Sequence, residues 1–257
     1  MSPNQIIRRL ARQLIPAATL NYVRKRLRTD LPCNAPSYQG VYTQHSMRWL
    51  HEGRFADIHD RHRKLNPFNN PNDTRLRQYS ACMYAEFSKN VQGDFMSAGI
   101  SFGVAPRVIF DFVEFEQLGK TYHFIDPFLG TNYPGEGVNP YNTDFEFVRR
   151  QYRDGAPVVF HRELLPDCFP MKGLERGLAF IHLNTTHPSA EAASLQYLYE
   201  KLNPGGFLLI DSYSFGTGQF DDYDKTIERI GAKVFNLVTG QGVIQKPPGT
   251  ENLSSGA

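Results

Sequence analysis

From Phe95 onward, short apolar runs alternate with longer amphipathic segments along the chain. This alternation predicts strands joined by crossover helices, which assemble into a parallel sheet with helices on its faces. Seven strands are expected, near residues 95–99, 121–126, 157–160, 178–184, 206–211, 233–238 and 243–246. Helices are expected near residues 103–118, 143–153, 188–202 and 219–230. The predicted fold is therefore an open, mainly parallel α/β sheet.

The last two expected strands are connected by only a short segment, residues 239–242, which reads Thr-Gly-Gln-Gly. A connection this short, with two glycines, is typical of a β-hairpin. The final strand is therefore expected to run antiparallel to its neighbour, at the end of an otherwise parallel sheet.

The chain has 257 residues, a length that suits one α/β domain with an extension. Residues 1–72 are predicted to form a helical and irregular N-terminal extension, which we interpret as a cap or a lid. Residues 73–246 are predicted to form the α/β domain, opened by a helix that begins at residues 72–74 and ends near Val91. Residues 247–257 are polar and are expected to be disordered.

Residues 2–28 contain seven arginines and lysines and no acidic residue, with aliphatic residues at helical spacing on either side of Pro16. One interpretation is a pair of short helices that contact an anionic membrane surface or a partner. The favoured interpretation is a solvated flank that packs on the domain. The formal net charge of the whole chain is only +2, which argues against nucleic acid as a partner.

Cysteine usage and hydropathy indicate the compartment. Cys33, Cys82 and Cys168 are far apart and odd in number, which suits a reducing compartment without structural disulfides. The longest apolar runs have the length of strands, and the N-terminus has no apolar signal core. A cytoplasmic location is therefore expected, and the formation of a homodimer is left open.

The first expected strand leads into a turn that contains Gly99 and Gly103. Glycines at a strand-to-helix turn let the backbone approach a nucleotide-sized ligand, and the helix N-terminus offers free N–H groups. The alternative is a tight turn without a ligand, and the two glycines alone do not decide between them.

A carboxylate follows the second expected strand, because Asp126 ends the segment Tyr-His-Phe-Ile-Asp. In open α/β sheets the ligand crevice lies outside the carboxyl ends of the strands, so Gly99 and Asp126 are expected to converge on one ligand. Asp126 follows Gly103 by 23 residues (126 − 103), near the spacing of nucleotide-binding folds. We therefore predict that Asp126 accepts the ribose hydroxyls of that ligand.

The sequence resembles the macrocin O-methyltransferase family over residues 74–246. Residues 93–103 (GDFMSAGISFG) are similar to the family's first motif, and residues 126–130 (DPFLG) to its D-x-F-x-G motif. Residues 202–207 (LNPGGF) and 210–213 (IDSY) are similar to its L-x-P-G-G and D-D-Y segments. The resemblance implies a Rossmann-like class I methyltransferase fold, S-adenosylmethionine as cofactor, and methyl transfer to a hydroxyl of a sugar, glycan or secondary metabolite.

The resemblance places Ser97, Gly99, Gly103, Asp126 and Phe128 at the cofactor, with Ser97 at a position where the family usually has glutamate. Our separate interpretation of the third strand tip places Arg162 near the adenine.

The chain departs from the family where the resemblance implies acidic ligands of a magnesium ion. Asn184 and Thr186 stand at two of these aspartate positions, and Ser212 replaces the second acid of D-D-Y. Only Asp211 remains, and hard divalent cations favour several oxygen ligands including carboxylates. A bound divalent metal is therefore not expected, and the activity is predicted to be independent of metal.

Without a metal, deprotonation of a hydroxyl needs a positioned base. His182 and His187 flank the tip of the fourth expected strand, and Asp211 ends the fifth. His187 is the first choice, with Asp211 as the carboxylate that orients it. The alternative is that residues 186–188 only cap the helix that follows.

Two other functions remain open. A catalytically inactive binding or assembly protein with the same fold would explain the missing acids. An NAD-dependent oxidoreductase would use the same sheet and ribose acid, but it expects a phosphate loop richer in glycine. We favour the methyltransferase, with a small molecule or a glycan as acceptor.

Overall fold

The structure is a computed structural model that describes residues 37–38, 41–42, 46–66, 74–129, 144–185, 187–214 and 220–249. The chain divides into two compact units, Met1–Ser46 and Met47–Ala257. In the smaller unit, the described residues form one short antiparallel pair, β1 (Ser37–Tyr38) and β2 (Val41–Tyr42). The basic segment 2–28 lies outside the described residues, as do residues 250–257 of the expected tail.

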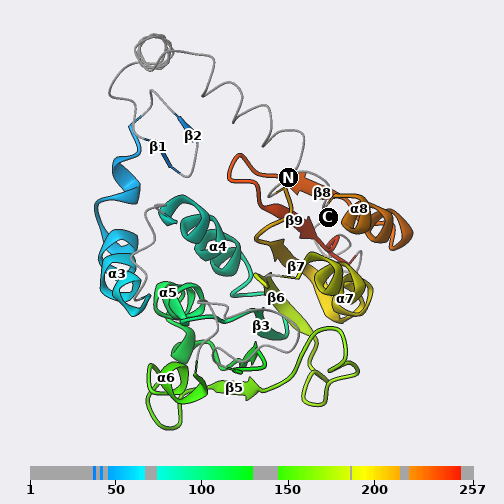
Figure 1. The fold of residues 1–257 in the computed structure, drawn as a ribbon, viewed down its shortest axis with the longest axis horizontal. Helices are drawn as coiled ribbons and strands as arrows, with labels where there is room; N and C mark the ends of the chain where they lie inside the picture. Colours follow the sequence, from blue (N-terminus) through cyan, green and yellow to red (C-terminus); the bar gives the residue numbers. More distant parts are fainter. Residues whose placement is uncertain are drawn as a thin grey trace, which may run out of the picture. The chain divides into compact units, whose positions relative to one another are not determined.

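The larger unit contains a seven-stranded sheet. Its strands are β3 (Asp94–Ala98), β4 (Tyr122–Ile125), β5 (Val158–His161), β6 (Leu178–Leu183), β7 (Leu202–Ile210), β8 (Val234–Asn236) and β9 (Gly242–Gln245). They lie in the order β5-β4-β3-β6-β7-β9-β8 (Figure 1). Neighbours from β5 to β7 are parallel, whereas β9 is antiparallel to both β7 and β8. The predicted sheet with an antiparallel last strand is confirmed.

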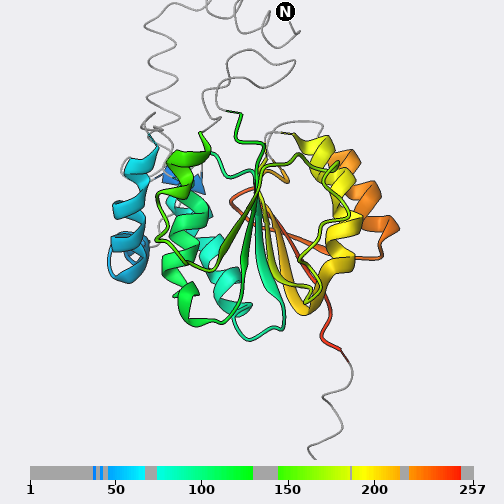
Figure 2. The same cartoon turned by 90° about the horizontal axis from the view of Figure 1, so that it is seen from below.

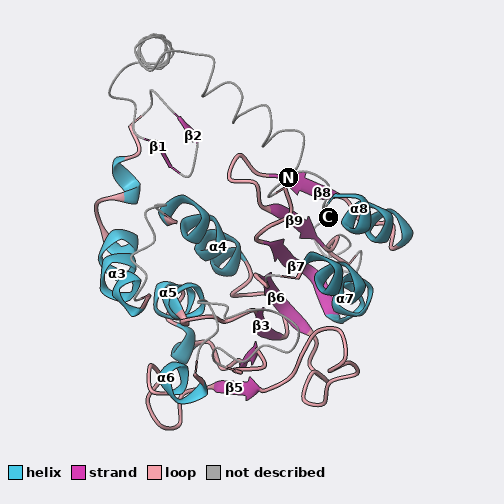
Figure 3. Cartoon of the chain, viewed as in Figure 1, coloured by secondary structure: helices cyan, strands magenta, loops and turns pink. Residues whose placement is uncertain are grey.

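Helices cover both faces of this sheet (Figure 2). One face carries α4 (Arg75–Phe87) and α5 (Val104–Phe112), with α3 (Arg54–His62) packed against α5, and the other carries α7 (Pro188–Lys201) and α8 (Phe220–Arg229). The short helix α6 (Phe145–Arg149) precedes β5, and residues 162–177 form a long loop between β5 and β6 (Figure 3). Within the described part of the chain, no helix has the length and apolarity needed to cross a membrane.

Several element boundaries differ from the expected ones; α6, for example, is shorter than the helix expected at residues 143–153. β7 begins at Leu202 rather than near residue 206, because Leu202 pairs with Leu178 before the register shifts and Phe207 pairs with Phe180. The intervening Pro-Gly-Gly absorbs this shift, as such residues do at irregular points of strands. The helix expected at residues 103–118 is α5, which ends at Phe112. A separate 3₁₀ turn, Phe115–Gln117, follows Glu114, whose φ is +53°.

The core fixes the strand ends at one edge of the sheet. Successive side chains of β3 point to opposite faces. Phe95 packs on the α5 side, with its ring centroid 5.4 Å from that of Phe180. Met96 belongs to the buried cluster on the α7 side. The register pairs Ala98 with both Ile125 and Leu183, so β3, β4 and β6 end side by side.

Candidate functional site

The carboxyl ends of the parallel strands border a cavity of about 640 Å³, its open mouth included. Gly99 after β3, Asp126 after β4 and His187 before α7 all line it, together with the start of the 162–177 loop. The structure thus brings together three residues that the sequence singled out on separate segments. A volume of this size is ordinary for a small-molecule site.

Asp126 connects the tip of β4 to the turn after β3. Its Oδ2 accepts hydrogen bonds from the backbone N–H groups of Ile100 (2.8 Å) and Ser101 (3.4 Å), and its Oδ1 accepts one from Phe128 (2.8 Å). Burial raises the pKa of Asp126, although these hydrogen bonds act in the opposite direction. A carboxylate has about four acceptor positions, so the side chain retains capacity for a ligand hydroxyl in the cavity.

Gly99 and Gly103 have positive φ angles, +79° and +77°. A Cβ on Gly99 would lie 2.2 Å from the backbone oxygen of Asn184, and a Cβ on Gly103 would lie 2.6 Å from Oε1 of Gln151. The protein's own packing therefore requires Gly99, whereas at Gly103 the contacted atom is the end of a flexible side chain and it is the positive φ that favours glycine. Gly103 is the N-cap residue of α5 and is not part of the cavity lining, so its contact with a ligand stays a prediction.

Three other predicted cofactor residues are not among the residues that line the cavity. The hydroxyl of Ser97 is buried and bonds to the hydroxyl of Tyr122 (2.8 Å). Phe128 is buried with its ring centroid 5.5 Å from that of Phe145, and the exposed guanidinium of Arg162 lies 5.1 Å from the same ring. These contacts are with neighbouring side chains of the fold, and direct contact of the three residues with a cofactor stays a prediction.

Glu163 lines the cavity, although Arg162 was the residue chosen at this strand tip. It lies two residues beyond the end of β5, next to the Arg162 that was selected. Both residues are polar and follow the same strand tip, so the sequence pattern contains no signal that separates them. With Asp126, Glu163 gives the cavity two carboxylates, and Leu164 and Leu165 give it an apolar side.

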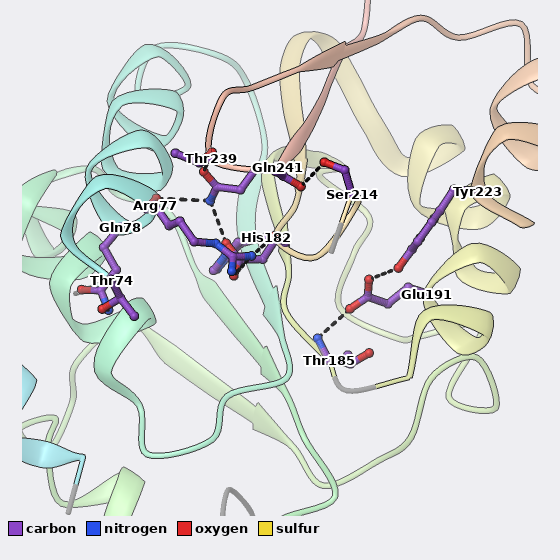
Figure 4. Close-up of polar contacts among 12 residues, drawn as sticks. Thr74, Arg77, Gln78, His182, Thr185, Glu191, Ser214, Tyr223, Thr239 and Gln241 are labelled. Atoms are coloured by element: carbon purple, nitrogen blue, oxygen red, sulfur yellow. Dashed lines mark hydrogen bonds and ion pairs between the residues drawn. The ribbon is translucent and has the colours of Figure 1, made fainter. Parts of the chain in front are cut away.

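Asp211 directly follows β7 and lies in a polar cluster with residues of three other segments. Its Oδ2 is 2.8 Å from a guanidinium nitrogen of Arg77 in α4, and its Oδ1 accepts a hydrogen bond from Nε2 of Gln241 (2.7 Å). Nε2 of His182 lies 3.5 Å from the same Oδ1. Figure 4 shows Arg77, Gln241 and His182 converging from α4, the turn before β9 and β6.

The surroundings of Asp211 favour its ionised form. Burial is the largest influence and acts to raise the pKa of Asp211. The hydrogen bond with His182, the charge of Arg77 and the amide of Gln241 together outweigh burial, so the pKa lies below its ordinary value. Asp211 is therefore a fixed anion whose charge is balanced within the protein.

The two predicted histidines have different positions. His182 is buried, with 2% of its surface exposed, and faces Asp211 from β6. His187 lines the cavity, and its backbone N–H donates to Oγ1 of Thr185 (3.2 Å). Asp211 thus contacts His182, and its orientation of His187 stays a prediction. Arg77 and Gln241 were missed, because no local pattern marks them.

The residues around Asp211 do not fit a divalent cation. Its two oxygens face a guanidinium and an amide N–H, which are not metal ligands, and the imidazole of His182 is the one neighbour among these three that could ligate a metal. In the described part of the chain, no group of three or more His, Cys, Asp or Glu side chains is arranged to hold a metal ion. Arg77 supplies the positive charge that Asp211 requires.

The strand order, with β9 inserted antiparallel between β7 and β8, and the cavity at the carboxyl ends of β3, β4 and β6 define the fold of class I methyltransferases. No protein-family model and no curated protein sequence matches the chain. Solved structures with this fold do match.

The O-methyltransferase NovP has a TM-score of 0.55 at 20% identity, over 66% of this chain and 79% of NovP. The methyltransferase PaMTH1 of Podospora anserina, solved with S-adenosylhomocysteine bound, has a TM-score of 0.53 at 13% identity, over 91% of this chain and 98% of PaMTH1. CalS11, a TDP-rhamnose 3′-O-methyltransferase of calicheamicin biosynthesis, has a TM-score of 0.50 at 14% identity, over 78% of this chain and 99% of CalS11. At identities this low, the structural similarity establishes the fold and nothing finer.

Proposed function

We propose that the chain is an S-adenosylmethionine-dependent O-methyltransferase that acts, without a metal, on a hydroxyl of a sugar, a glycan or a secondary metabolite. The observation that carries the proposal is the cavity of about 640 Å³ in which Asp126, Gly99 and His187 meet at the strand ends of this fold. The macrocin O-methyltransferase-like motifs at residues 93–103 and 126–130 support the cofactor, because residues of both segments line this cavity.

The cavity suits the ribose and the adenine of the cofactor. Asp126 accepts the ribose hydroxyls, and the apolar side formed by Leu164 and Leu165 receives the adenine, with Glu163 placed to accept from its amino group. When bound, S-adenosylmethionine supplies an electrophilic methyl group on a sulfonium. The carboxylates also suit a ligand that carries this positive charge.

His187 is the proposed general base. It lies in the cavity wall, and a neutral imidazole accepts a proton at physiological pH. Asp211 and His182 are proposed to act as a fixed pair beside the acceptor and not as the base, since His182 is buried. A sugar acceptor is supported by the resemblance and by CalS11, whose named substrate is a nucleotide sugar.

Titration calorimetry with S-adenosylhomocysteine tests the cofactor site. We expect micromolar binding by the wild-type protein and a loss of roughly 100-fold in Asp126→Ala, because hydrogen bonds to a charged acceptor contribute about 1.5–3 kcal/mol each. Asp126→Asn, which keeps one acceptor oxygen, is expected to lose less. Asp154→Asn is the matched control, since its carboxylate is 98% exposed. Absence of binding by the wild-type protein would contradict the proposal.

Single-turnover kinetics with an accepted acceptor test the base. We expect His187→Gln to lower the rate of methyl transfer by roughly 10²–10⁴-fold, the usual contribution of a general base, while the affinity for S-adenosylhomocysteine is unchanged. The wild-type rate is expected to be the same in EDTA. An unchanged rate in His187→Gln would remove His187 from the mechanism, and strong inhibition by EDTA would contradict metal independence.

The ion pair of Arg77 with Asp211 also favours a second candidate, an inactive binding or assembly protein with this fold, because it engages the one acid retained from the family pattern. Such a protein would bind S-adenosylmethionine and never release S-adenosylhomocysteine with any acceptor. Product analysis of the acceptor screen separates the two candidates.

A further inference from the structure

Glu191 is a fully buried carboxylate in the first turn of α7. Its Oε1 accepts a hydrogen bond from the backbone N–H of Thr185 (2.6 Å), in the turn between β6 and α7. Its Oε2 accepts one from the hydroxyl of Tyr223 in α8 (2.5 Å). Figure 4 shows the three side by side, with the carboxylate of Glu191 between Thr185 and Tyr223.

The hydrogen bond between Glu191 and Thr185 connects Glu191 to the cavity wall. Thr185 and His187 both line the cavity, whereas Glu191 and Tyr223 do not. Oγ1 of Thr185 accepts the hydrogen bond from the backbone N–H of His187 (3.2 Å). Glu191 therefore holds the residue that in turn holds His187, so the shape of this wall depends on a side chain behind it.

Glu191 is a costly residue for packing alone. A buried carboxylate loses its hydration, and an apolar side chain of similar size is often as stable or more stable at such a position. Here each oxygen has a donor, and the first turn of a helix favours negative charge. The carboxylate specifies one geometry of the turn, which an apolar residue would not do.

The helix α8 connects this clamp to the other strand end of the site. Asp224, next to Tyr223, accepts a hydrogen bond from the hydroxyl of Tyr213, which follows Asp211 by two residues. The rings of Tyr213 and Tyr223 lie 5.6 Å apart. Adjacent residues of α8 thus support the turns after both β6 and β7.

We propose that Glu191 is a positioning residue of this site: through Thr185 it holds Asn184 and Thr185 in the arrangement that receives the cofactor and presents His187. This inference rests on the proposed function. Removing the Glu191 carboxylate is therefore expected to weaken ligand binding more than an equally destabilising substitution elsewhere in α7.

The test compares Glu191→Ala, Glu191→Gln and Tyr223→Phe with Leu198→Ala, a control that truncates a fully buried residue of the same helix. One readout is the affinity for S-adenosylhomocysteine by calorimetry. The other is hydrogen exchange of the backbone amides of residues 184–187 in the ligand-free protein.

We expect Glu191→Ala to weaken binding roughly tenfold, because the ligand must then order a loosened turn. Exchange of the Thr185 and His187 amides should accelerate by at least about tenfold, since a lost hydrogen bond opens them to solvent. Glu191→Gln is expected to restore both readouts to within about twofold, because its carbonyl oxygen accepts from Thr185 and its amide donates to Tyr223. Tyr223→Phe should have an intermediate effect, and Leu198→Ala should lower the Tm without changing affinity.

Equal weakening of binding by Glu191→Ala and Leu198→Ala would overturn the inference, because it would show a general effect of stability. Unchanged exchange of Thr185 in Glu191→Ala would overturn it as well. If the wild-type protein does not bind S-adenosylhomocysteine, the proposed function fails and the positioning role fails with it, whereas exchange still reports whether Glu191 holds the turn.

Discussion

Arg77→Met is expected to lower the free energy of unfolding by about 3–5 kcal/mol, the usual cost of leaving one partner of a buried ion pair. The guanidinium of Arg77 and the carboxylate of Asp211 are 14% and 15% exposed and lie 2.8 Å apart. Methionine keeps much of the apolar stem but removes the charge, so Asp211 remains buried without its cation. Urea denaturation monitored by circular dichroism measures the change.

A second substitution separates charge from packing. In Arg77→Met/Asp211→Asn, the uncompensated charge is gone, and the amide is still able to pair with Gln241. We expect this double variant to recover more than half of the loss, because well-packed neutral replacements of a buried ion pair are often close to neutral. If Arg77→Met lowers the free energy of unfolding by less than about 1 kcal/mol, Asp211 is hydrated in solution and the prediction is wrong.

The sheet was predictable because it depends on local patterns. Each strand appears as a short apolar run, and the connection at residues 239–242 indicates the antiparallel end. The convergence of Gly99, Asp126 and His187 was also predictable, since the carboxyl ends of parallel strands meet at one edge. These inferences need only the order of the strands.

The partners of Asp211 were not predictable in the same way. Arg77 is 134 positions away in the sequence and Gln241 is 30 positions away, and neither interrupts the pattern of its own segment. Which histidine contacts Asp211 depends on the face of β6 to which His182 points and on the path of the turn that leads to His187. The pattern places both histidines near the edge but does not choose between them.

The reason for a glycine was likewise hidden. The sequence left open whether Gly99 serves the approach of a ligand or only a tight turn, and the structure shows that a Cβ would collide with the backbone of Asn184. Both explanations predict the same residue type at the same strand end. Only the distance between neighbouring turns shows that the protein itself needs the glycine.

Acid is expected to destabilise this protein through His123, which lies on β4 with 3% of its surface exposed. Its Nδ1 is 3.0 Å from Nε2 of His161, and the two rings are stacked. Burial, followed by the neighbouring His161, lowers the pKa of His123 to about 4 from its ordinary 6.5. Nearby Asp94 and Glu175 act in the opposite direction but do not compensate.

The sign follows from proton binding. Between about pH 6.5 and pH 4 the unfolded chain carries a proton on His123 that the folded chain does not, so folding loses stability as the pH falls. At about 1.4 kcal/mol per pH unit, the full loss is about 3 kcal/mol. The contribution of His123 is complete above about pH 6.5 and absent below about pH 4.

The comparison of wild type with His123→Leu isolates this group, because other acid-sensitive pairs such as Asp211 with Arg77 are present in both proteins. We expect the free energy of unfolding of the variant, measured in urea from pH 7.5 to pH 4, to fall by about 3 kcal/mol less than that of the wild type. His51→Leu, at an exposed histidine, is the control and should follow the wild-type curve. Parallel curves for wild type and His123→Leu would mean that His123 is protonated within the fold, and the stacked histidine pair would then have to open as the pH falls.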